Sequence, residues 1–267
     1  MASENLANSA HSQSLERGLA ILAAFSTGRS LIGVSELARE LGLGRSTTHR
    51  YVATLARLGY LRQDETSRRY RLGLRVLDLG FTALNSMELR DIAEPHLQQL
   101  SDETGHTVNM AILDSAHIVY IVRCRSSSVA QREIDLNLHV GALLPAYCTS
   151  MGKVLLAHLA EGERDAALAQ TDFSRRGPNT ITTAATLEKE LVHVRGSGFA
   201  LNDEELAYGL RSIAMPIRTQ TGEVTAAINL AAHRSMISID DLIARLSPAL
   251  RHTADEISAR LGFRAPA

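Results

Sequence analysis

The spacing of apolar residues near the start of the chain restricts the fold more than any other feature. Three stretches place apolar residues on one side of a predicted helix, and breaks containing glycine separate them. A segment with a polar tip at residues 64–67 then predicts a hairpin between residues 60 and 72. The predicted helices run from Ser14 to about Thr27, from Gly33 or Ser35 to about Leu41, and from about Arg45 to Leu58. This is the order of a winged helix-turn-helix domain, which we place at residues 14–72, after a stretch expected to be disordered at residues 1–13.

The third predicted helix has a polar side that suits nucleic acid. His49, Arg50 and Arg57 fall on this side, and no acidic residue occurs between Arg45 and Leu61. A solvated structural helix usually carries acidic residues that pair with the basic ones. Its first turn offers a guanidinium and three hydroxyls, which are groups that recognition helices use against base edges and phosphates. The alternative is a helical packing module with a basic surface.

Charge is distributed unevenly, although the net charge of the chain is only −1. Residues 1–80 hold 11 arginines, no lysine and seven acidic residues, whereas the remaining residues hold 17 basic and 22 acidic residues. A basic beginning favours a polyanionic partner for that part of the chain, and we expect it to be double-stranded DNA. The residues expected at the DNA are Ser35, then Arg45, Ser46, Thr47, His49 and Arg50 at the groove, and Arg68, Arg69 and Arg71 at phosphates beside the wing.

Residues 73–86 predict a linker helix. Leu74, Leu77, Phe81 and Leu84 have nearly heptad spacing, which suits a helix that packs against a second copy of itself.

The remaining residues, 87–267, change from helical to mixed patterns. Helices are predicted at residues 88–104, 149–159, 187–195 and between about 239 and 261. Runs rich in β-branched residues predict strands at residues 107–113, 117–123, 133–140, 212–218 and 224–231. Strand pairs with helices before, between and after them indicate an α+β domain built on one antiparallel sheet.

Several functional classes are disfavoured by composition. Cys124 and Cys148 are the only cysteines, too few for a disulfide framework or a cysteine-built metal cluster. No stretch reaches the roughly 18 apolar residues of a membrane span, and residues 1–13 lack the order of a secretory signal. We therefore expect a cytoplasmic protein without a cofactor. A metal site assembled by the fold from scattered histidines stays an alternative.

Residues 144–157 read LPAYCTSMGKVLLA, and residues 198–218 read GFALNDEELAYGLRSIAMPIR. Together with residues 14–61, SLERGLAILAAFSTGRSLIGVSELARELGLGRSTTHRYVATLARLGYL, they resemble the IclR family of transcriptional regulators. The sequences of the two later blocks are most similar to those of family members that regulate protocatechuate, 4-hydroxybenzoate and β-ketoadipate catabolism. The resemblance implies a winged helix that dimerises, a GAF/PAS-like domain that binds a small organic acid, and dimers that pair into tetramers on DNA.

The resemblance also implies an effector pocket. The backbone amides of Ser150 and Met151 correspond to those that hold a carboxylate in the family, and a helix N-terminus favours an anion. Leu143, Leu144 and the Met151 side chain are expected to form an apolar wall. The predicted effector-binding residues are Leu143, Leu144, Ser150, Met151, Asn202, Ser212, Asn229 and Ala231.

The predicted pocket departs from that of the glyoxylate- and pyruvate-binding relatives. Those proteins tend to have Asp in place of Asn202, Cys in place of Ser212, and serines in place of Asn229 and Ala231. We therefore expect an acid other than these small ones. The alternative to a pocket is that Ser212 and Asn229 only satisfy backbone groups at strand ends.

These patterns predict a ligand-responsive transcriptional regulator, either repressor or activator, of a catabolic operon. The alternative is a small-molecule-binding or hydrolytic domain whose helical head serves for oligomerisation. Ser150-Met151-Gly152-Lys153 matches S-x-x-K, in which a lysine activates a nucleophilic serine. The companion S-D-N and K-T-G motifs are missing from the sequence, so we do not expect an enzyme.

Overall fold

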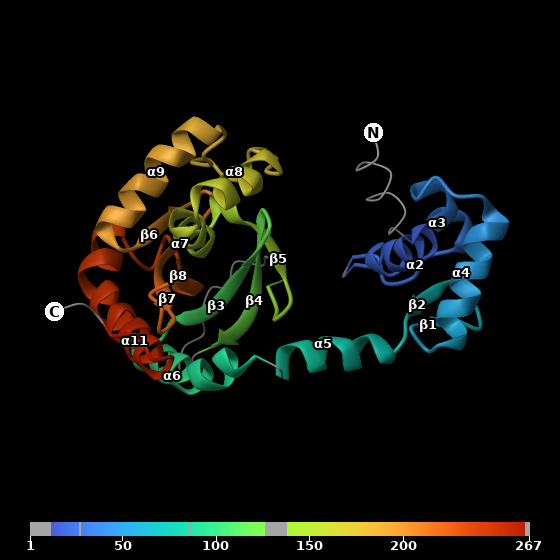
Figure 1. Ribbon diagram of the computed structural model, residues 1–267, viewed down its shortest axis with the longest axis horizontal. Helices are drawn as coiled ribbons and strands as arrows, with labels where there is room; N and C mark the ends of the chain where they lie inside the picture. The colour runs from blue at the N-terminus through green and yellow to red at the C-terminus, as the bar shows by residue number, and fades with distance from the viewer. Residues whose placement is uncertain (1–11, 27, 86, 126–137, 265–267) are drawn as a thin grey trace. The chain divides into compact units, whose positions relative to one another are not determined.

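The chain folds into two compact units, Met1–Ala83 and Leu84–Ala267. The computed structural model describes residues 12–26, 28–85, 87–125 and 138–264 (Figure 1). Among these residues, no helix combines the length and the apolar character that crossing a membrane requires.

The N-terminal unit has the predicted winged helix-turn-helix order. Ile21, Leu37 and Val52 come from successive helices and are fully buried against Leu61 and Tyr70 of the hairpin. The strands of this hairpin pair antiparallel, with Leu61 opposite Leu72. The elements are α2 (Gln13–Ala23), α3 (Val34–Glu40), α4 (Arg45–Arg57), β1 (Leu61–Gln63) and β2 (Tyr70–Leu72).

The ends of α2 differ from the prediction. The helix begins at Gln13 and is capped by Ser12, whose hydroxyl accepts a hydrogen bond from the Leu15 amide, so Ser14 is not the cap. It ends at Ala23 rather than near Thr27, because the backbone turns back on itself through a pairing of Ser26 with Arg29. Apolar periodicity continued past this turn and therefore overestimated the length of the helix.

Both glycine-rich breaks around α4 adopt the expected conformation. Gly42 has φ +63° in the turn before α4, and Gly59 has φ +83° after it, a region that glycine enters without strain. The Leu58 side chain is 45% exposed. Leu58 caps the end of α4, beyond the last turn that packs on the core.

The predicted linker helix is α5 (Arg75–Asn85). The boundary between the two units falls within it, and Leu84 packs against the core of the C-terminal unit. Leu74, Leu77, Leu79 and Phe81 are all more than half exposed. Exposed apolar side chains gathered in this way are typical of a surface that another chain covers.

The C-terminal unit is built on one antiparallel sheet, as predicted. Its strands lie in the order β5-β4-β3-β8-β7-β6, and each neighbouring pair runs antiparallel. The strands are β3 (Thr107–Asp114), β4 (His117–Cys124), β5 (Leu143–Pro145), β6 (Ala200–Asp203), β7 (Leu210–Arg218) and β8 (Val224–His233). The helices are α6 (Glu88–Thr104), η1 (Ala146–Cys148), α7 (Ser150–His158), α8 (Glu161–Ala169), α9 (Ala184–Ser197), α10 (Ile239–Asp241), η2 (Leu242–Leu246) and α11 (Ser247–Arg260).

Helices cover both faces of this sheet (Figure 1). On one face, α6 and α11 pack on large apolar side chains such as Met110, Ile228 and Leu230. On the other face, α7 and α9 pack on smaller residues that include Ala214 and Ala227. The small side chains bring α7 close to the sheet, and the candidate cavity lies on this side.

Four elements, β5, β6, η1 and α8, were not predicted from the sequence. β5 and β6 have only three and four residues, too short for an alternating pattern to be recognised. The strand predicted at Glu133–Val140 lies mostly outside the described residues, and the described part, residues 138–140, is not a strand. The closing helix is present, but η2 is a π-helical segment that precedes Pro248, a residue without the N–H that a regular helix needs.

Candidate functional site

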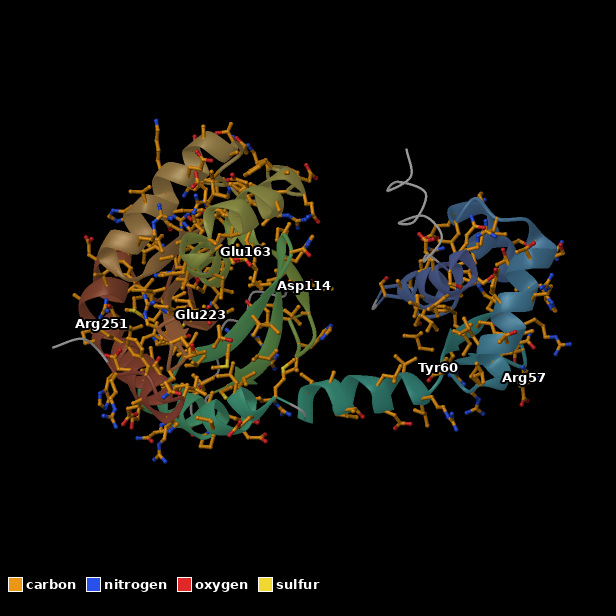
Figure 2. The ribbon with its side chains drawn as sticks, in the orientation of Figure 1. Arg57, Tyr60, Asp114, Glu163, Glu223 and Arg251 are labelled. Atoms are coloured by element: carbon orange, nitrogen blue, oxygen red, sulfur yellow. The ribbon has the colours of Figure 1, made fainter. Side chains whose placement is uncertain are left out.

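The exposed side of α4 is strongly polar and basic. Arg45, Ser46, His49 and Arg50 are exposed, and Arg57 extends away from the N-terminal unit at the end of the same helix (Figure 2). Gly44 caps the helix without a side chain, which leaves its first backbone N–H groups accessible. This surface offers hydrogen-bond donors without an acidic neighbour on its own helix.

The two threonines in the first turn of α4 differ in accessibility. Thr47 is half-buried, whereas Thr48 is fully buried and donates its hydroxyl hydrogen to the Gly44 carbonyl over 3.1 Å. The first turn therefore presents Ser46 and part of Thr47 to a partner, and the third hydroxyl belongs to the helix.

The arginines of the hairpin have different surroundings. Arg68 and Arg71 are exposed, and Arg68 adopts φ +58° at the turn. Arg69 instead donates to both oxygens of Glu36 over 2.5 and 2.6 Å. This contact lowers the pKa of the Glu36 carboxyl and joins the wing to α3, beside the exposed Ser35.

Arg62 also belongs to this basic surface, although it was not predicted from the sequence. Arg62 and Arg71 are directly opposite each other across β1 and β2, and both are exposed. Like charges at paired positions repel each other, and a phosphate between them would relieve the repulsion. Counting back from the polar tip of the predicted hairpin could have placed Arg62 opposite Arg71.

A small cavity lies between the sheet and the N-terminus of α7. Its volume is about 20 Å³, room for about one water molecule. The lining residues come from both faces of this gap and are Asn109, Tyr120, Leu138, Thr149, Ser150, Asn202, Leu206, Leu210, Ser212, Asn229 and Ala231.

Strand register brings three of the predicted pocket residues into one row. Asn202 pairs with Ser212, and Ser212 pairs with Ala231, across β6, β7 and β8. The Ser212 hydroxyl lies 2.7 Å from the Ser150 hydroxyl at the start of α7. Asn202 donates to the Cys148 carbonyl over 2.8 Å, so this row is joined to the segment that enters the helix.

A second row lies beside the first. Arg123 of β4 pairs with Asn109 of β3, which pairs with Asn229 of β8. Arg123 Nη1 donates to Asn109 Oδ1 over 3.0 Å, and Asn109 Nδ2 donates to Asn229 Oδ1 over 2.8 Å. Both asparagines are at least 95% buried. The predicted Asn229 is thus part of a polar chain that crosses three strands.

The entry to α7 presents backbone donors towards the same cavity. Thr149 caps the helix by accepting a hydrogen bond from the Gly152 amide, and the amides of Ser150 and Met151 precede it without an acceptor within the helix. A Cβ at position 152 would collide with the Ala146 carbonyl oxygen, so this tight entry requires glycine. Helix N-termini of this kind favour anions.

The predicted apolar wall lies elsewhere. Leu143 is 58% exposed on the edge strand β5, and Leu144 packs beside the apolar core below α7. The Met151 side chain is fully buried in that core, although its amide lies at the helix start. None of these three side chains lines the cavity; its apolar lining comes instead from Tyr120, Leu138, Leu206 and Leu210.

A β-bulge explains why Tyr120 and Arg123 share one face of the sheet. The register shifts between Met110 and Ala111, so that β4 carries one extra residue, Ile121. Tyr120 and Arg123 are three positions apart, and simple alternation would place them on opposite faces. In the sequence, Asn109 and Arg123 could have been noticed only as a single amide and a single guanidinium within otherwise apolar strands.

Burial raises the pKa of the Tyr120 hydroxyl to about 12, which keeps this group neutral.

Lys153 is fully buried and paired with two carboxylates. Its ammonium lies 2.6 Å from Glu205 Oε1 and 3.0 Å from Glu190 Oε1. Burial raises the pKa of the Glu205 carboxyl, and the charge of Lys153 opposes this shift. Ser150 contacts Ser212 instead of Lys153, and an ammonium held by carboxylates is a poor base. The serine–lysine hydrolase alternative therefore finds no support in this geometry.

The buried thiols are also poorly suited to chemistry. Burial raises the pKa of Cys124 to about 11 and that of Cys148 to about 12, so the reactive thiolate is disfavoured in both. Cys124 and Cys148 are free and buried.

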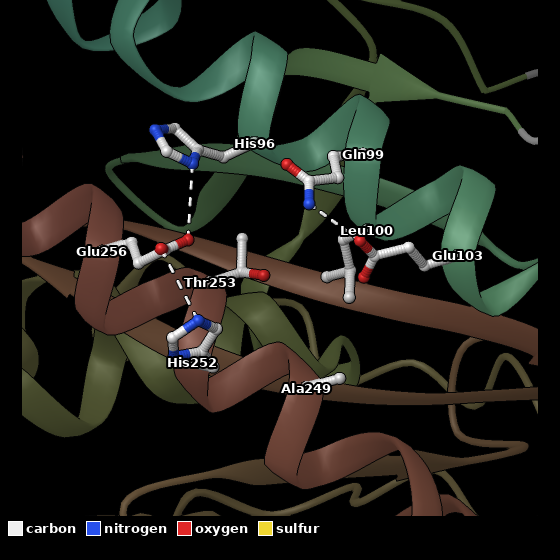
Figure 3. A pocket seen from close by; sticks show the side chains of 8 residues that line it. All are labelled: His96, Gln99, Leu100, Glu103, Ala249, His252, Thr253 and Glu256. Carbon is white, nitrogen blue, oxygen red and sulfur yellow. Dashed lines mark hydrogen bonds and ion pairs between the residues drawn. The ribbon is translucent and has the colours of Figure 1, made fainter.

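A groove between α6 and α11 is lined by polar side chains (Figure 3). Glu256 lies between two imidazoles, with one oxygen 3.5 Å from His96 Nδ1 and the other 3.5 Å from His252 Nε2. Gln99 donates to Glu103 on the neighbouring turns of α6. Among the described residues, no group of three or more His, Cys, Asp or Glu side chains is arranged to hold a metal ion.

Two family models match separate parts of the chain. A family model described as "IclR helix-turn-helix domain" matches residues 14–65. A second, described as "Bacterial transcriptional regulator IclR C-terminal", matches residues 81–259.

Individual relatives match most of the chain. The Pca regulon regulatory protein of Pseudomonas putida is 35% identical over 248 residues, which cover 93% of this chain and 84% of that protein. A crystal structure of a transcriptional regulator from Rhodococcus sp. RHA1 has a TM-score of 0.78 at 39% identity, covering 94% of this chain and 98% of the other. The inducer-binding domain of the PobR transcription factor from Acinetobacter, a double mutant in complex with 3-hydroxybenzoic acid, has a TM-score of 0.59 at 31% identity. That match covers 63% of this chain and 97% of the other.

Proposed function

The chain belongs to the IclR family of bacterial transcriptional regulators, and we propose that a small organic acid bound in its C-terminal cavity controls how it binds operator DNA. The acid is an aromatic acid or a metabolite of the β-ketoadipate pathway. The relatives are regulators rather than enzymes, and the proposal assigns no reaction to this chain.

The observation that carries the DNA-binding part is the exposed side of α4. Arg45, Ser46, His49 and Arg50 point to solvent at the start of a helix that has no acidic residue. In the proposal this helix enters the major groove, while Arg68 and Arg71 contact phosphates beside it. A bacterial regulator must reach operator DNA in the cytoplasm, so we propose that the protein acts there.

The observation that carries the effector part is the set of buried polar groups around the cavity. Ser150, Asn202, Ser212 and Asn229 line it together with the start of α7, where an anion is favoured. The PobR inducer-binding domain in complex with 3-hydroxybenzoic acid is a relative whose name points to an aromatic acid.

The size of the cavity gives the proposal a mechanism. A hydroxybenzoate is much larger than the about 20 Å³ cavity, so the lining side chains must move when the acid binds. An acid that fits only the opened form shifts the population towards that form by its difference in affinity. In the proposal, this shift reaches DNA through α5, which joins the two units.

The proposal also includes a homodimer that can pair into a tetramer. Leu77 and Phe81 of α5, together with Leu74 just before it, are exposed apolar side chains that a second copy can cover. Two recognition helices would then reach half-sites about one helical turn of DNA apart, or a multiple of that distance.

The proposed function is tested by measuring binding of the full chain to the DNA upstream of its own gene by fluorescence anisotropy. The titration is repeated at several salt concentrations and with protocatechuate, 4-hydroxybenzoate, β-ketoadipate or glyoxylate. We expect tight binding that weakens steeply with salt and changes with one of the first three acids. Absence of DNA binding at low salt would contradict the regulator, and indifference to all acids would contradict the effector class.

A substitution within the cavity separates the two parts of the proposal. Ser212→Leu fills the cavity with an apolar side chain and removes the hydroxyl that contacts Ser150. We expect this variant to bind DNA like the wild type but to lose its response to the acid. A normal response would show that the effector binds elsewhere.

A further inference from the structure

The row of Arg123, Asn109 and Asn229 has a defined direction of hydrogen bonding. Arginine carries only donors, so the Asn109 oxygen must face it, and this leaves the Asn109 amide group to donate to Asn229 Oδ1. An asparagine can otherwise present either its oxygen or its nitrogen to a neighbour. The guanidinium therefore determines the orientation of both amides.

The end of the row is a donor at the cavity. Asn229 accepts through Oδ1, and its Nδ2 hydrogens have no acceptor among the residues that the structure describes. The side chain is 95% buried and lines the cavity. A donor that faces an enclosed cavity favours a ligand that brings an acceptor.

We infer that Arg123 is a specificity-determining positioning residue, which orients Asn109 and Asn229 so that the cavity selects organic acids carrying a second oxygen acceptor. This inference rests on the proposed function, because it assumes that the acid binds in this cavity. The first carboxylate lies at the start of α7, and the second acceptor, a carboxylate or hydroxyl oxygen, reaches Asn229 Nδ2.

The position of Arg123 supports this role. The bulge at Ile121 turns Arg123 to the face that carries the cavity, yet Arg123 does not line the cavity itself. Its charge acts through two buried amides, where hydrogen bonds polarise one another and water does not screen them. Replacing Arg123 should therefore change which acid is preferred without touching the ligand directly.

The test uses three probes of similar shape with the full chain. Terephthalate carries a second acceptor, 4-aminobenzoate carries a donor group in the same place, and benzoate carries neither. Isothermal titration calorimetry measures the affinity of the wild type for each probe. We expect the wild type to bind terephthalate about tenfold or more tightly than 4-aminobenzoate.

Three substitutions of Arg123 test the direction of the row. Arg123→Lys keeps a donor and should keep the order of affinities. Arg123→Glu supplies an acceptor, so both amides should turn around and 4-aminobenzoate should become the preferred probe. Arg123→Met removes the constraint and should bring the ratio of the two affinities close to one. DNA affinity without acid should stay at the wild-type value in all three and shows that each variant is folded.

An unchanged preference in Arg123→Glu would overturn the inference. If that variant does not fold, an unchanged ratio in Arg123→Met would overturn it equally. The inference alone fails if the acids bind the wild type and Ser212→Leu abolishes the response, but the Arg123 variants keep the wild-type ratio of affinities. When no probe binds the wild type while DNA binding persists, the effector part of the proposed function fails as well.

Discussion

The surface of α4 and the cavity beneath α7 are both rich in polar side chains, but these side chains have opposite surroundings. On α4, Arg45, His49 and Arg50 are exposed to solvent. Around the cavity, Ser212 and Asn229 are at least 95% buried and bonded to other protein groups. The first arrangement suits a large, hydrated polyanion, and the second suits a small molecule that must be distinguished from close analogues.

The difference also determines how each region responds to its surroundings. Charges at the surface are screened by salt over about 8 Å at physiological ionic strength. Buried hydrogen bonds are screened far less, and breaking one leaves a partner without water. We therefore expect salt to weaken DNA binding much more than it weakens acid binding.

The largest effect is expected at the buried ion pair next to the cavity. Lys153→Met leaves Glu205 buried without its cation, which should lower the free energy of unfolding of the C-terminal unit by about 3–5 kcal/mol. Chemical unfolding followed by circular dichroism measures the change, and hydrogen exchange assigns it to the C-terminal unit.

The chain offers a matched control, because its other lysine, Lys189, is exposed on α9. Lys189→Met should change the free energy of unfolding by well under 1 kcal/mol. Equal effects of the two substitutions would mean that the buried pair does not stabilise the unit.

A smaller effect should distinguish two arginines of the wing. Arg71 is exposed beside Arg62, so Arg71→Ala should reduce the slope of log affinity for DNA against log salt by about one per copy. Arg69 is held by Glu36, and Arg69→Ala should leave the slope nearly unchanged but displace the wing. Salt titrations of both variants measure the slopes, and a larger slope change for Arg69 would show that the Glu36 contact opens when DNA binds.

The smallest effect concerns acid stability of the C-terminal unit. Burial and the nearby Arg218 lower the pKa of His158 below its usual 6.5; Nδ1 donates to the Val154 carbonyl and Nε2 accepts from Arg218. Below pH 6.5 the unfolded chain binds a proton that the folded chain resists, so stability falls as the pH decreases.

His158→Gln should reduce this fall, as measured by chemical unfolding at pH values on both sides of 6.5. Part of the fall should remain, because burial also lowers the pKa of His106 in the same unit. An unchanged pH dependence would show that His158 does not contribute to it.

The two regions also differ in how well the sequence predicts them. The polar side of α4 follows from the helical period alone, so Arg50 could be placed opposite Val52 without any tertiary contact. The contact between Arg69 and Glu36 could not be predicted in this way, because the two residues are 33 positions apart along the chain.

The cavity depends on strand register, which the sequence does not display. Asn202, Ser212 and Asn229 were expected at the pocket through resemblance to the family. Asn109 and Arg123 were missed, because their alignment with Asn229 needs the pairing of three strands and the bulge at Ile121. Leu143 and Leu144 do not line the cavity, because they belong to the short edge strand β5, which the sequence did not predict.

In the proposed function, the N-terminal unit recognises DNA and the C-terminal unit recognises the acid. This division is tested most directly by measuring both affinities in two variants, Arg50→Ala in the N-terminal unit and Ser212→Leu in the C-terminal unit. Anisotropy with operator DNA and calorimetry with the acid that the wild type binds provide the two affinities. We predict that Arg50→Ala weakens operator binding by about tenfold or more and leaves the acid affinity unchanged. We predict that Ser212→Leu weakens acid binding and leaves the operator affinity unchanged. Equal losses of both affinities in either variant would contradict this division.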